Sequence, residues 1–180
     1  MPYASSTWSS IRFLAPILFL AVLLGSYAGP ASAITMANDP LGFHHLSWGM
    51  ALTGIPELTV TRDNSHTTDY EFRDGPPVYA GIPVESLHLS TVDAQFARVT
   101  VRYRGAQTHR QVLKFLEHSY GVIERIPGQM MRGLNQQYSW RGPETEITLT
   151  YEANRDRGFV FIESRNLAPR FQDRIADTAE

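Results

Sequence analysis

Apolar and polar residues alternate most clearly in two runs, VESLHLSTV (residues 84–92) and FARVTVRYRG (residues 96–105). The two leucines of the first run share one face, and so do the two valines of the second. Such alternation is typical of antiparallel strands that bury one face against a core and leave the other in water. The pattern predicts a hairpin over residues 84–105, with Asp93-Ala94-Gln95 between the strands.

The register of this hairpin follows from its apolar residues. A turn of only two residues would set Leu89 opposite Arg98 and mix apolar and charged side chains on one face. A shift of one residue sets Leu89 opposite Val99 and makes one face uniformly apolar. Burying a large apolar side chain stabilises a fold by about 1.5–3 kcal/mol, which exceeds a turn preference. We therefore expect either the longer three-residue loop or a bulge near Phe96 that restores the pairing.

The run THRQVLKFLEHSYG (residues 108–121) has the helical period instead. Its apolar side chains recur at helical spacing, at Val112, Leu113, Leu116 and Tyr120. Thr108 and Gln111 fit a capping box, and Gly121 stands where a glycine commonly ends a helix. The pattern predicts one amphipathic helix over this run.

Shorter patterns predict the remaining elements. Strands are expected at residues 43–48, 70–75, 136–142, 145–152 and 158–166, and a loop at 123–133. A short helix is expected within residues 50–60, where Gly54 and Pro56 weaken it, and another in residues 167–180, with Pro169 in its first turn. Together these elements predict an α+β fold, mainly antiparallel sheet with helices on one face. Their order is also compatible with a weakly duplicated α-β-β-β unit.

The first 33 residues have the three parts of a secretory signal peptide. Arg12 precedes the apolar run FLAPILFLAVLL, and Ala31-Ser32-Ala33 is a small-residue cleavage signature. The run is shorter than the ~20 residues that a spanning helix needs. We expect cleavage after Ala33, a short leader at residues 34–41 and a single domain at residues 42–180. The mature form is expected in the periplasm or outside the cell, with no membrane span.

Composition narrows the chemistry. The chain has no cysteine, which rules out thiol catalysis, thiolate zinc sites and disulfides. Its formal charge is −2, and removal of Arg12 with the signal peptide takes it to −3. Nucleic-acid-binding domains are usually strongly basic, so no nucleic-acid partner is expected.

Candidate catalytic and metal sites are weak. His44 and His45 are adjacent, and on a strand their side chains point to opposite faces, so they cannot chelate one ion together. Carboxylates two residues apart occur at Asp69/Glu71 and Glu144/Glu146, as on any solvated strand face. The chain has none of the G-x-S-x-G, S-x-x-K, P-loop or G-x-G-x-x-G motifs. We expect no metal, no cofactor and no enzyme activity, and we nominate no catalytic residue.

The most specific polar feature is a row of arginines on one strand. Arg98, Arg102 and Arg104 share its polar face, and the preferred register sets His88 across from Thr100 beside them. The row is either a solvated outer face or a groove for an anionic ligand or an acidic patch on a partner. On the second interpretation Arg98, Arg102 and His88 form the candidate binding site.

Several short motifs resemble a known group of proteins. They are Phe43-x-x-Leu46-x-Trp48-Gly49, Gly81-Ile82-Pro83-Val84, Leu116-Glu117-x-x-Tyr120-Gly121, Tyr138-x-Trp140 and Ile147-x-Leu149-x-Tyr151. In this order they look like a group of small secreted bacterial proteins of unknown function, which typically read WG, GVPV, YG and YxW. The resemblance covers most of residues 42–165. It implies a compact periplasmic α+β domain and brings no catalytic residue with it.

These observations favour a non-catalytic exported module that binds a protein or another envelope component. The alternative is a small-ligand or lipid-binding domain with its site between helices and sheet, and the third possibility is an enzyme of unrecognised type. A closed interior cavity would favour ligand binding. A filled core with an exposed aromatic or arginine patch would favour a binding module.

Overall fold

The structure is a computed structural model that describes residues 34–123 and 135–177. All the described residues belong to one compact unit, Ala31–Glu180. The predicted signal peptide and most of the predicted loop at residues 123–133 lie outside the described residues. None of the described helices is long and apolar enough to cross a membrane.

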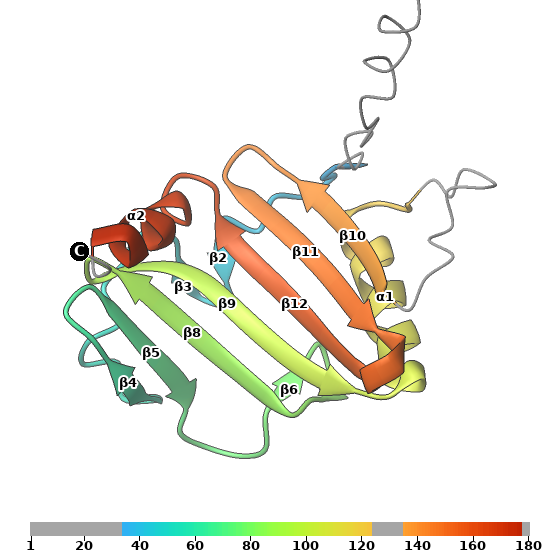
Figure 1. Ribbon diagram of the computed structural model, residues 1–180, viewed down its shortest axis with the longest axis horizontal. Helices are drawn as coiled ribbons and strands as arrows, with labels where there is room; N and C mark the ends of the chain where they lie inside the picture. The colour runs from blue at the N-terminus through green and yellow to red at the C-terminus, as the bar shows by residue number, and fades with distance from the viewer. Residues whose placement is uncertain (1–33, 124–134, 178–180) are drawn as a thin grey trace, which may run out of the picture. The chain divides into compact units, whose positions relative to one another are not determined.

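An eight-stranded sheet is the main element of the fold (Figure 1). Its strand order is β1-β10-β11-β12-β9-β8-β5-β4, and every neighbouring pair is antiparallel except β1 and β10. The strands are β1 (Ile34–Thr35), β4 (Leu58–Asp63), β5 (Thr67–Phe72), β8 (Ser86–Val92), β9 (Gln95–Arg104), β10 (Asn135–Arg141), β11 (Thr145–Glu152) and β12 (Arg157–Ser164). The predicted α+β class with a mainly antiparallel sheet is confirmed.

The other elements are short. They are the helices α1 (Ala106–Tyr120) and α2 (Pro169–Asp177), the 3-10 turn η1 (Ala153–Arg155), the two-stranded ribbon of β2 (Gly42–Phe43) and β3 (Leu46–Ser47), and the ribbon of β6 (Val78–Tyr79) and β7 (Ile82–Pro83).

One face of the sheet carries the main core. Alternate strand residues point to it, and α1 covers them together with residues 36–55 and the β6–β7 ribbon. The strand side chains of this core include Leu87, Leu89, Val99, Val101, Tyr103, Trp140, Ile147, Leu149, Val160 and Ile162. From α1 come Val112, Leu113 and Leu116, so the predicted apolar face of the helix is confirmed.

The second helix lies against the opposite face. Leu167 and Phe171 form a small separate cluster with Val92 and Ala97, and the Arg98 guanidinium lies over the Phe171 ring at 4.2 Å. In Figure 1, α2 is in front of the sheet and α1 is behind it. The prediction of a helix beginning near Pro169 is confirmed, but the expectation that the helices share one face is wrong.

The central hairpin has the expected register, and a bulge rather than a longer loop produces it. Leu89 pairs with Val99 and His88 with Thr100. The connection is a two-residue turn in which Asp93 and Ala94 have φ of 49° and 63°, and the register shifts beyond Ser90. A bulge next to Phe96 therefore restores the pairing, and the longer loop does not form.

The helix α1 begins earlier than its sequence pattern indicates. Ala106 is its first residue, Gly105 is the N-cap with φ of 94°, and no side chain caps it. The predicted capping box at Thr108 is therefore wrong. Gly121 ends the helix as predicted and donates its N–H to the Glu117 carbonyl.

The N-terminal third differs most from expectation. His44 and His45 form the turn between β2 and β3 instead of lying on one strand, and His44 has φ of 53°. Residues 50–60, all of them described, contain no helix, and their last part belongs to β4. Without that helix, the first half of the chain lacks the proposed α-β-β-β unit. Residues 34–41 are part of the fold rather than a leader, because β1 pairs with β10 and Met36 is buried.

Candidate binding face of the sheet

The face of the sheet opposite α1 is only partly covered, and we call it the open face. Its central residues alternate with the buried ones along four strands. They are Ser86 and His88 on β8, Arg98, Thr100 and Arg102 on β9, Thr148 and Thr150 on β11, and Phe159, Phe161 and Glu163 on β12. Among the described elements, α2 is the helix that packs on this face, and it covers one end. All three predicted site residues lie here.

Two phenylalanines occupy the middle of the open face. The rings of Phe159 and Phe161 are nearly parallel, at 10°, with centroids 6.1 Å apart, and both are partly exposed. Their cross-strand neighbours on β11 are Thr150 and Thr148. The centre is therefore a patch of aromatic and hydroxyl side chains, and the Arg157 guanidinium lies over the Phe159 ring at 5.1 Å.

Ion pairs surround this patch. Arg98 donates to the carboxylate of Glu163, its cross-strand neighbour on β12. Arg141 and Glu146 form a second pair at 2.9 Å. These guanidinium groups are thus already matched by carboxylates of the same chain.

The other arginines of the predicted row share one carboxylate. Arg104 donates to Glu85. The Arg102 Nε lies 3.0 Å from the second oxygen of Glu85, though without hydrogen-bond geometry, so this contact is ionic. A groove for an anionic ligand needs uncompensated positive charge. The pairing removes most of the support for that interpretation of the row.

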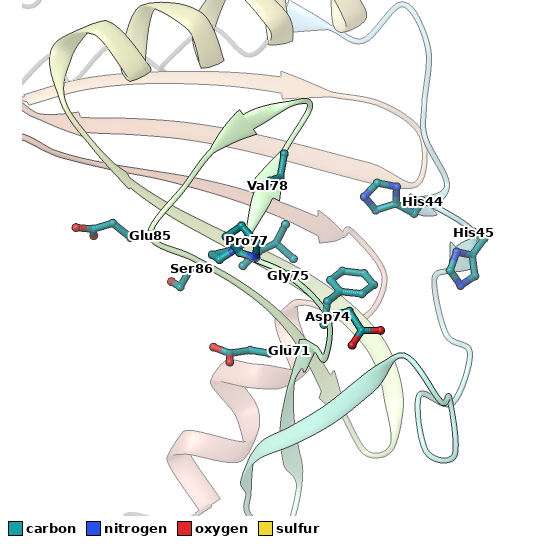
Figure 2. Close-up of a pocket in the computed structure, with 12 residues that line it drawn as sticks. His44, His45, Glu71, Asp74, Gly75, Pro77, Val78, Glu85 and Ser86 are labelled. Atoms are coloured by element: carbon teal, nitrogen blue, oxygen red, sulfur yellow. The ribbon is translucent and has the colours of Figure 1, made fainter.

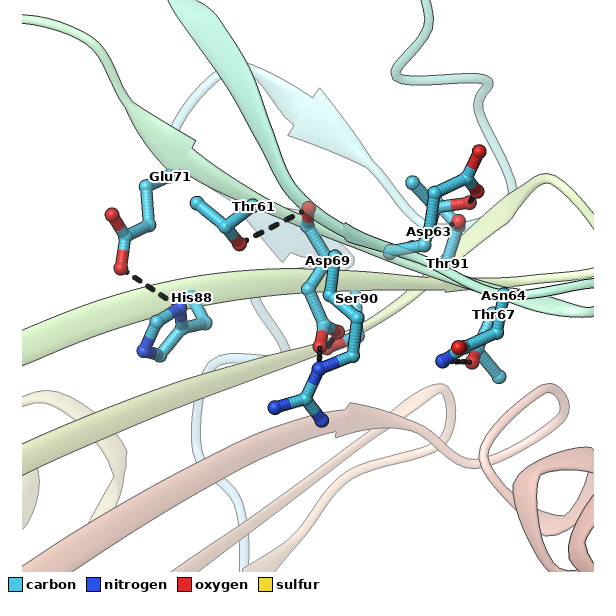
Figure 3. Close-up of polar contacts among 11 residues, drawn as sticks. Thr61, Asp63, Asn64, Thr67, Asp69, Glu71, His88, Ser90 and Thr91 are labelled. Atoms are coloured by element: carbon cyan, nitrogen blue, oxygen red, sulfur yellow. Dashed lines mark hydrogen bonds and ion pairs between the residues drawn. The ribbon is translucent and has the colours of Figure 1, made fainter.

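The predicted binding histidine is also engaged. His88 Nδ1 lies 3.0 Å from Glu71 on β5, as Figure 3 shows. The Ser90 hydroxyl donates to Asp69 at 2.6 Å on the same pair of strands. The carboxylates of Asp69 and Glu71 therefore both have partners, and neither is placed as a free acid or base.

The second predicted carboxylate pair has partners too. Glu146 binds Arg141, and Glu144 accepts a hydrogen bond of 2.7 Å from the Asn166 amide. Both carboxylate pairs thus take part in contacts within the chain.

An open cleft of about 460 Å³ adjoins one end of β8 (Figure 2). Its lining includes His44, Asp74, Pro77 and Leu87, together with Glu71 and Glu85. Those two carboxylates are already held by His88 and by Arg102 and Arg104. Two of the carboxylates that line the cleft are therefore engaged within the chain, which weakens the case for a small-ligand site there.

A small-ligand or lipid site would lie between α1 and the sheet, but side chains fill that space. Trp140, Tyr103 and Leu116 are fully buried there. The Trp140 indole donates to the Gly121 carbonyl at 2.8 Å, which fastens the end of α1 to β10.

The two adjacent histidines do not meet. His44 is exposed and lies edge-on to Phe72, with ring centroids 6.1 Å apart, and His45 Nε2 is 3.1 Å from Glu57. The expectation that His44 lies on a strand is wrong. Over residues 34–123 and 135–177, no three His, Asp or Glu side chains gather closely enough to hold a metal ion.

Two features escaped the sequence reasoning. Phe159 and Phe161 alternate with the buried Val160 and Ile162, so residues 158–162 are apolar on both faces. That double-sided pattern signals that β12 has apolar side chains on the open face as well as in the core. His109 is buried, at 4% exposure, among tyrosines of three strands, and it lies on the apolar side of the predicted helix.

Comparison with protein-family models, with curated proteins and with solved structures finds no match. The resemblance to small secreted bacterial proteins therefore stays a prediction. Its motifs have structural roles in this fold: the Trp48 indole donates to Thr145 at 2.9 Å, and Trp140 binds the carbonyl of Gly121.

Proposed function

We propose that the chain is an exported, non-catalytic module that binds a protein of the cell envelope through the open face. The observation that carries the proposal is the partly exposed pair Phe159 and Phe161, surrounded by arginine–carboxylate pairs. Protein–protein interfaces have this anatomy, an apolar centre with aromatic anchors inside a polar rim.

The size of the face fits a protein partner. From β10 to β5 there are six strands about 4.8 Å apart, and seven residues of strand span about 23 Å, so the flat area is about 550 Å², of which α2 covers one end. That area approaches the lower limit of a standard interface, about 600 Å² per partner. A partner that buried the exposed part of each phenylalanine would gain part of the ~1.5–3 kcal/mol of binding free energy that a fully buried side chain contributes.

Other partner classes have less support. A polyanion such as nucleic acid would meet arginines that Glu163 and Glu85 already neutralise. A lipid or small ligand between helix and sheet would have to displace buried side chains such as Trp140. The absence of a nominated catalytic set supports a binding role over an enzyme of unrecognised type.

Photo-crosslinking tests the binding face directly. A crosslinking side chain at Thr148, next to Phe161 on the open face, should give a covalent product with one defined envelope protein. Phe159→Thr with Phe161→Thr should reduce that product at least tenfold while the variant stays folded, because both phenylalanines are partly exposed and threonine suits a strand. Reversing Arg98 and Arg102 is a less specific variant, since it also breaks two ion pairs.

The control is Val60→Thr, which removes an apolar side chain of 51% exposure on β4, away from the phenylalanines. It should leave the product unchanged. Light scattering of the purified chain identifies a second copy as the partner if a dimer is present that the phenylalanine variant dissociates. Equal crosslinking in the phenylalanine and Val60 variants would refute the proposed face.

Export is a separate part of the proposal. Mass spectrometry of the chain recovered from the envelope should show a mature N-terminus at Ile34, as the Ala31-Ser32-Ala33 signature predicts. Recovery with residues 1–33 still attached would refute cleavage.

A further inference from the structure

His109 is the one polar residue among the four buried residues of α1. It lies in the first turns of the helix and stacks on Tyr151 of β11, with ring centroids 4.4 Å apart and an interplanar angle of 12°. Tyr103 of β9 and Tyr138 of β10 lie nearly parallel to it at 6.2 and 6.4 Å. One imidazole therefore joins the start of α1 to three strands.

Both ring nitrogens are hydrogen bonded, and their partners indicate which one carries the proton. Nε2 lies 3.1 Å from Gln136 Oε1, to which the Tyr138 hydroxyl also donates. A carbonyl oxygen only accepts, so Nε2 is the donor. Nδ1 lies 2.8 Å from the hydroxyl of Tyr103, whose pKa burial raises, so that hydroxyl donates to an unprotonated Nδ1. The arrangement suits a neutral imidazole.

A charged imidazole would be poorly compensated at this site. The titratable and charged groups around the ring, among the described residues, are Tyr103, Tyr138 and Tyr151, Arg110 beside it on α1, and Asp156, which Tyr151 holds at 2.6 Å. Attraction of a desolvated cation to the tyrosine faces, about 2 kcal/mol, is smaller than the cost of burying an unpaired charge. The positive end of the α1 dipole adds to that cost.

The rest of the helix start offers little to replace this attachment. No side chain caps α1, and its first turn has no acidic residue. Tyr103 is itself fixed, because its ring fills the space where a side chain of Gly158 would be. The His109 ring thus provides the polar attachment of the N-terminal half of α1 to the sheet.

We propose that His109 is a pH-sensitive latch, which holds the N-terminal half of α1 on the sheet when neutral and releases it when protonated. Burial lowers the pKa of His109 in the docked state, whereas a released histidine titrates near its ordinary value of about 6.5. Protonation therefore favours release. Docking is strongest above about pH 6.5 and weakens as the pH falls from there toward the lowered value.

Native-state hydrogen exchange of the purified chain tests the latch. After correction for intrinsic exchange rates, opening of residues 106–113 should increase up to about tenfold between pH 7.5 and pH 5.5. The β8–β9 hairpin should not follow. His109→Gln, which keeps a neutral hydrogen-bonding group, should abolish the pH dependence, and His118→Gln, at an exposed position of the same helix, should retain it.

Equal pH dependence in His109→Gln and in the unmodified chain would overturn the proposal, and so would an increase spread evenly over helix and hairpin. If His109→Gln does not fold, NMR titration of the unmodified chain decides. A titration midpoint of the His109 ring below pH 6.5, with the same midpoint for the backbone amide signals of α1, supports the latch. A midpoint at or above pH 6.5 refutes it.

Discussion

Gly158 is a residue at which packing leaves no room for a side chain. A Cβ added there would lie 2.1 Å from Cζ of Tyr103, its cross-strand neighbour on β9. The close approach lets Tyr103 lie flat on the sheet and reach His109. A glycine in a strand commonly marks such an approach, so the run beginning GFVF contains the signal, but nothing in it identifies the partner.

Gly158→Ala should therefore destabilise the fold by about 1–3 kcal/mol, because the buried Tyr103 ring must move away. Chemical denaturation measures the change in the free energy of unfolding. In a Tyr103→Ala background the same substitution should cost less than about 0.5 kcal/mol, since the obstructing ring is absent. A cost that is the same in both backgrounds would show that the clash is not its cause.

At the scale of elements, the sequence predicts best where one residue period persists. The strands β8, β9, β11 and β12 and the apolar face of α1 follow directly from their alternation or helical spacing. The errors occur where local signals compete. Thr108 offers a capping box, yet α1 begins at Ala106 with Gly105 as its N-cap. The apolar residues within 50–60 predict a helix, but this segment is irregular and packs its apolar side chains against the main core.

The sequence predicts the register of the β8–β9 hairpin but not whether a longer loop or a bulge in β9 produces it. The apolar faces determine the register, but a longer loop and a bulge satisfy them equally. Ala97, the extra residue, is buried with Val92, Leu167 and Phe171 of the small cluster. Contacts with Leu167 and Phe171, which lie 70 or more positions later in the chain, stabilise the bulge. The sequence of the hairpin alone does not reveal these contacts.

Deleting Ala97 should consequently preserve the register, because Ser90 would still oppose Arg98 and Leu89 would still oppose Val99. The expected cost is about 1–3 kcal/mol from lost contacts with α2. Cross-strand NOEs between residues 89 and 99 measure the pairing. Deletion of Thr100 is the matched control, since it moves every later residue of β9 to the other face and should prevent folding. Loss of the Leu89–Val99 pairing in the Ala97 deletion would contradict this account.

At the scale of the whole molecule, the candidate face could be predicted only in part. The arginine row follows from the alternation of β9 alone. Its neutralisation by Glu163 does not, because that pair depends on β12 lying beside β9, 65 residues away along the chain. Strand order is a long-range property. A row of charges on one strand therefore predicts a binding site poorly until its neighbours are known.

The sheet also separates two apolar clusters. The main core lies on the α1 face, and the α2 cluster lies on the open face. Leu116→Val in the first and Phe171→Leu in the second should each cost about 1–2 kcal/mol of the free energy of unfolding. Because the sheet lies between them and they share no buried neighbour, the double variant should show the sum within about 0.5 kcal/mol.

Val112→Ala with Leu116→Val provides the contrast, because these residues are four apart on the buried side of α1 and neighbour each other there. Their double variant should depart from the sum by 0.5 kcal/mol or more, roughly the coupling found for residues in contact. If the Leu116 and Phe171 variants departed from additivity as much as this pair, the packing of the two faces would be coupled through the sheet. The open face could then not be altered independently of the core, and binding there would change the attachment of α1 on the far side.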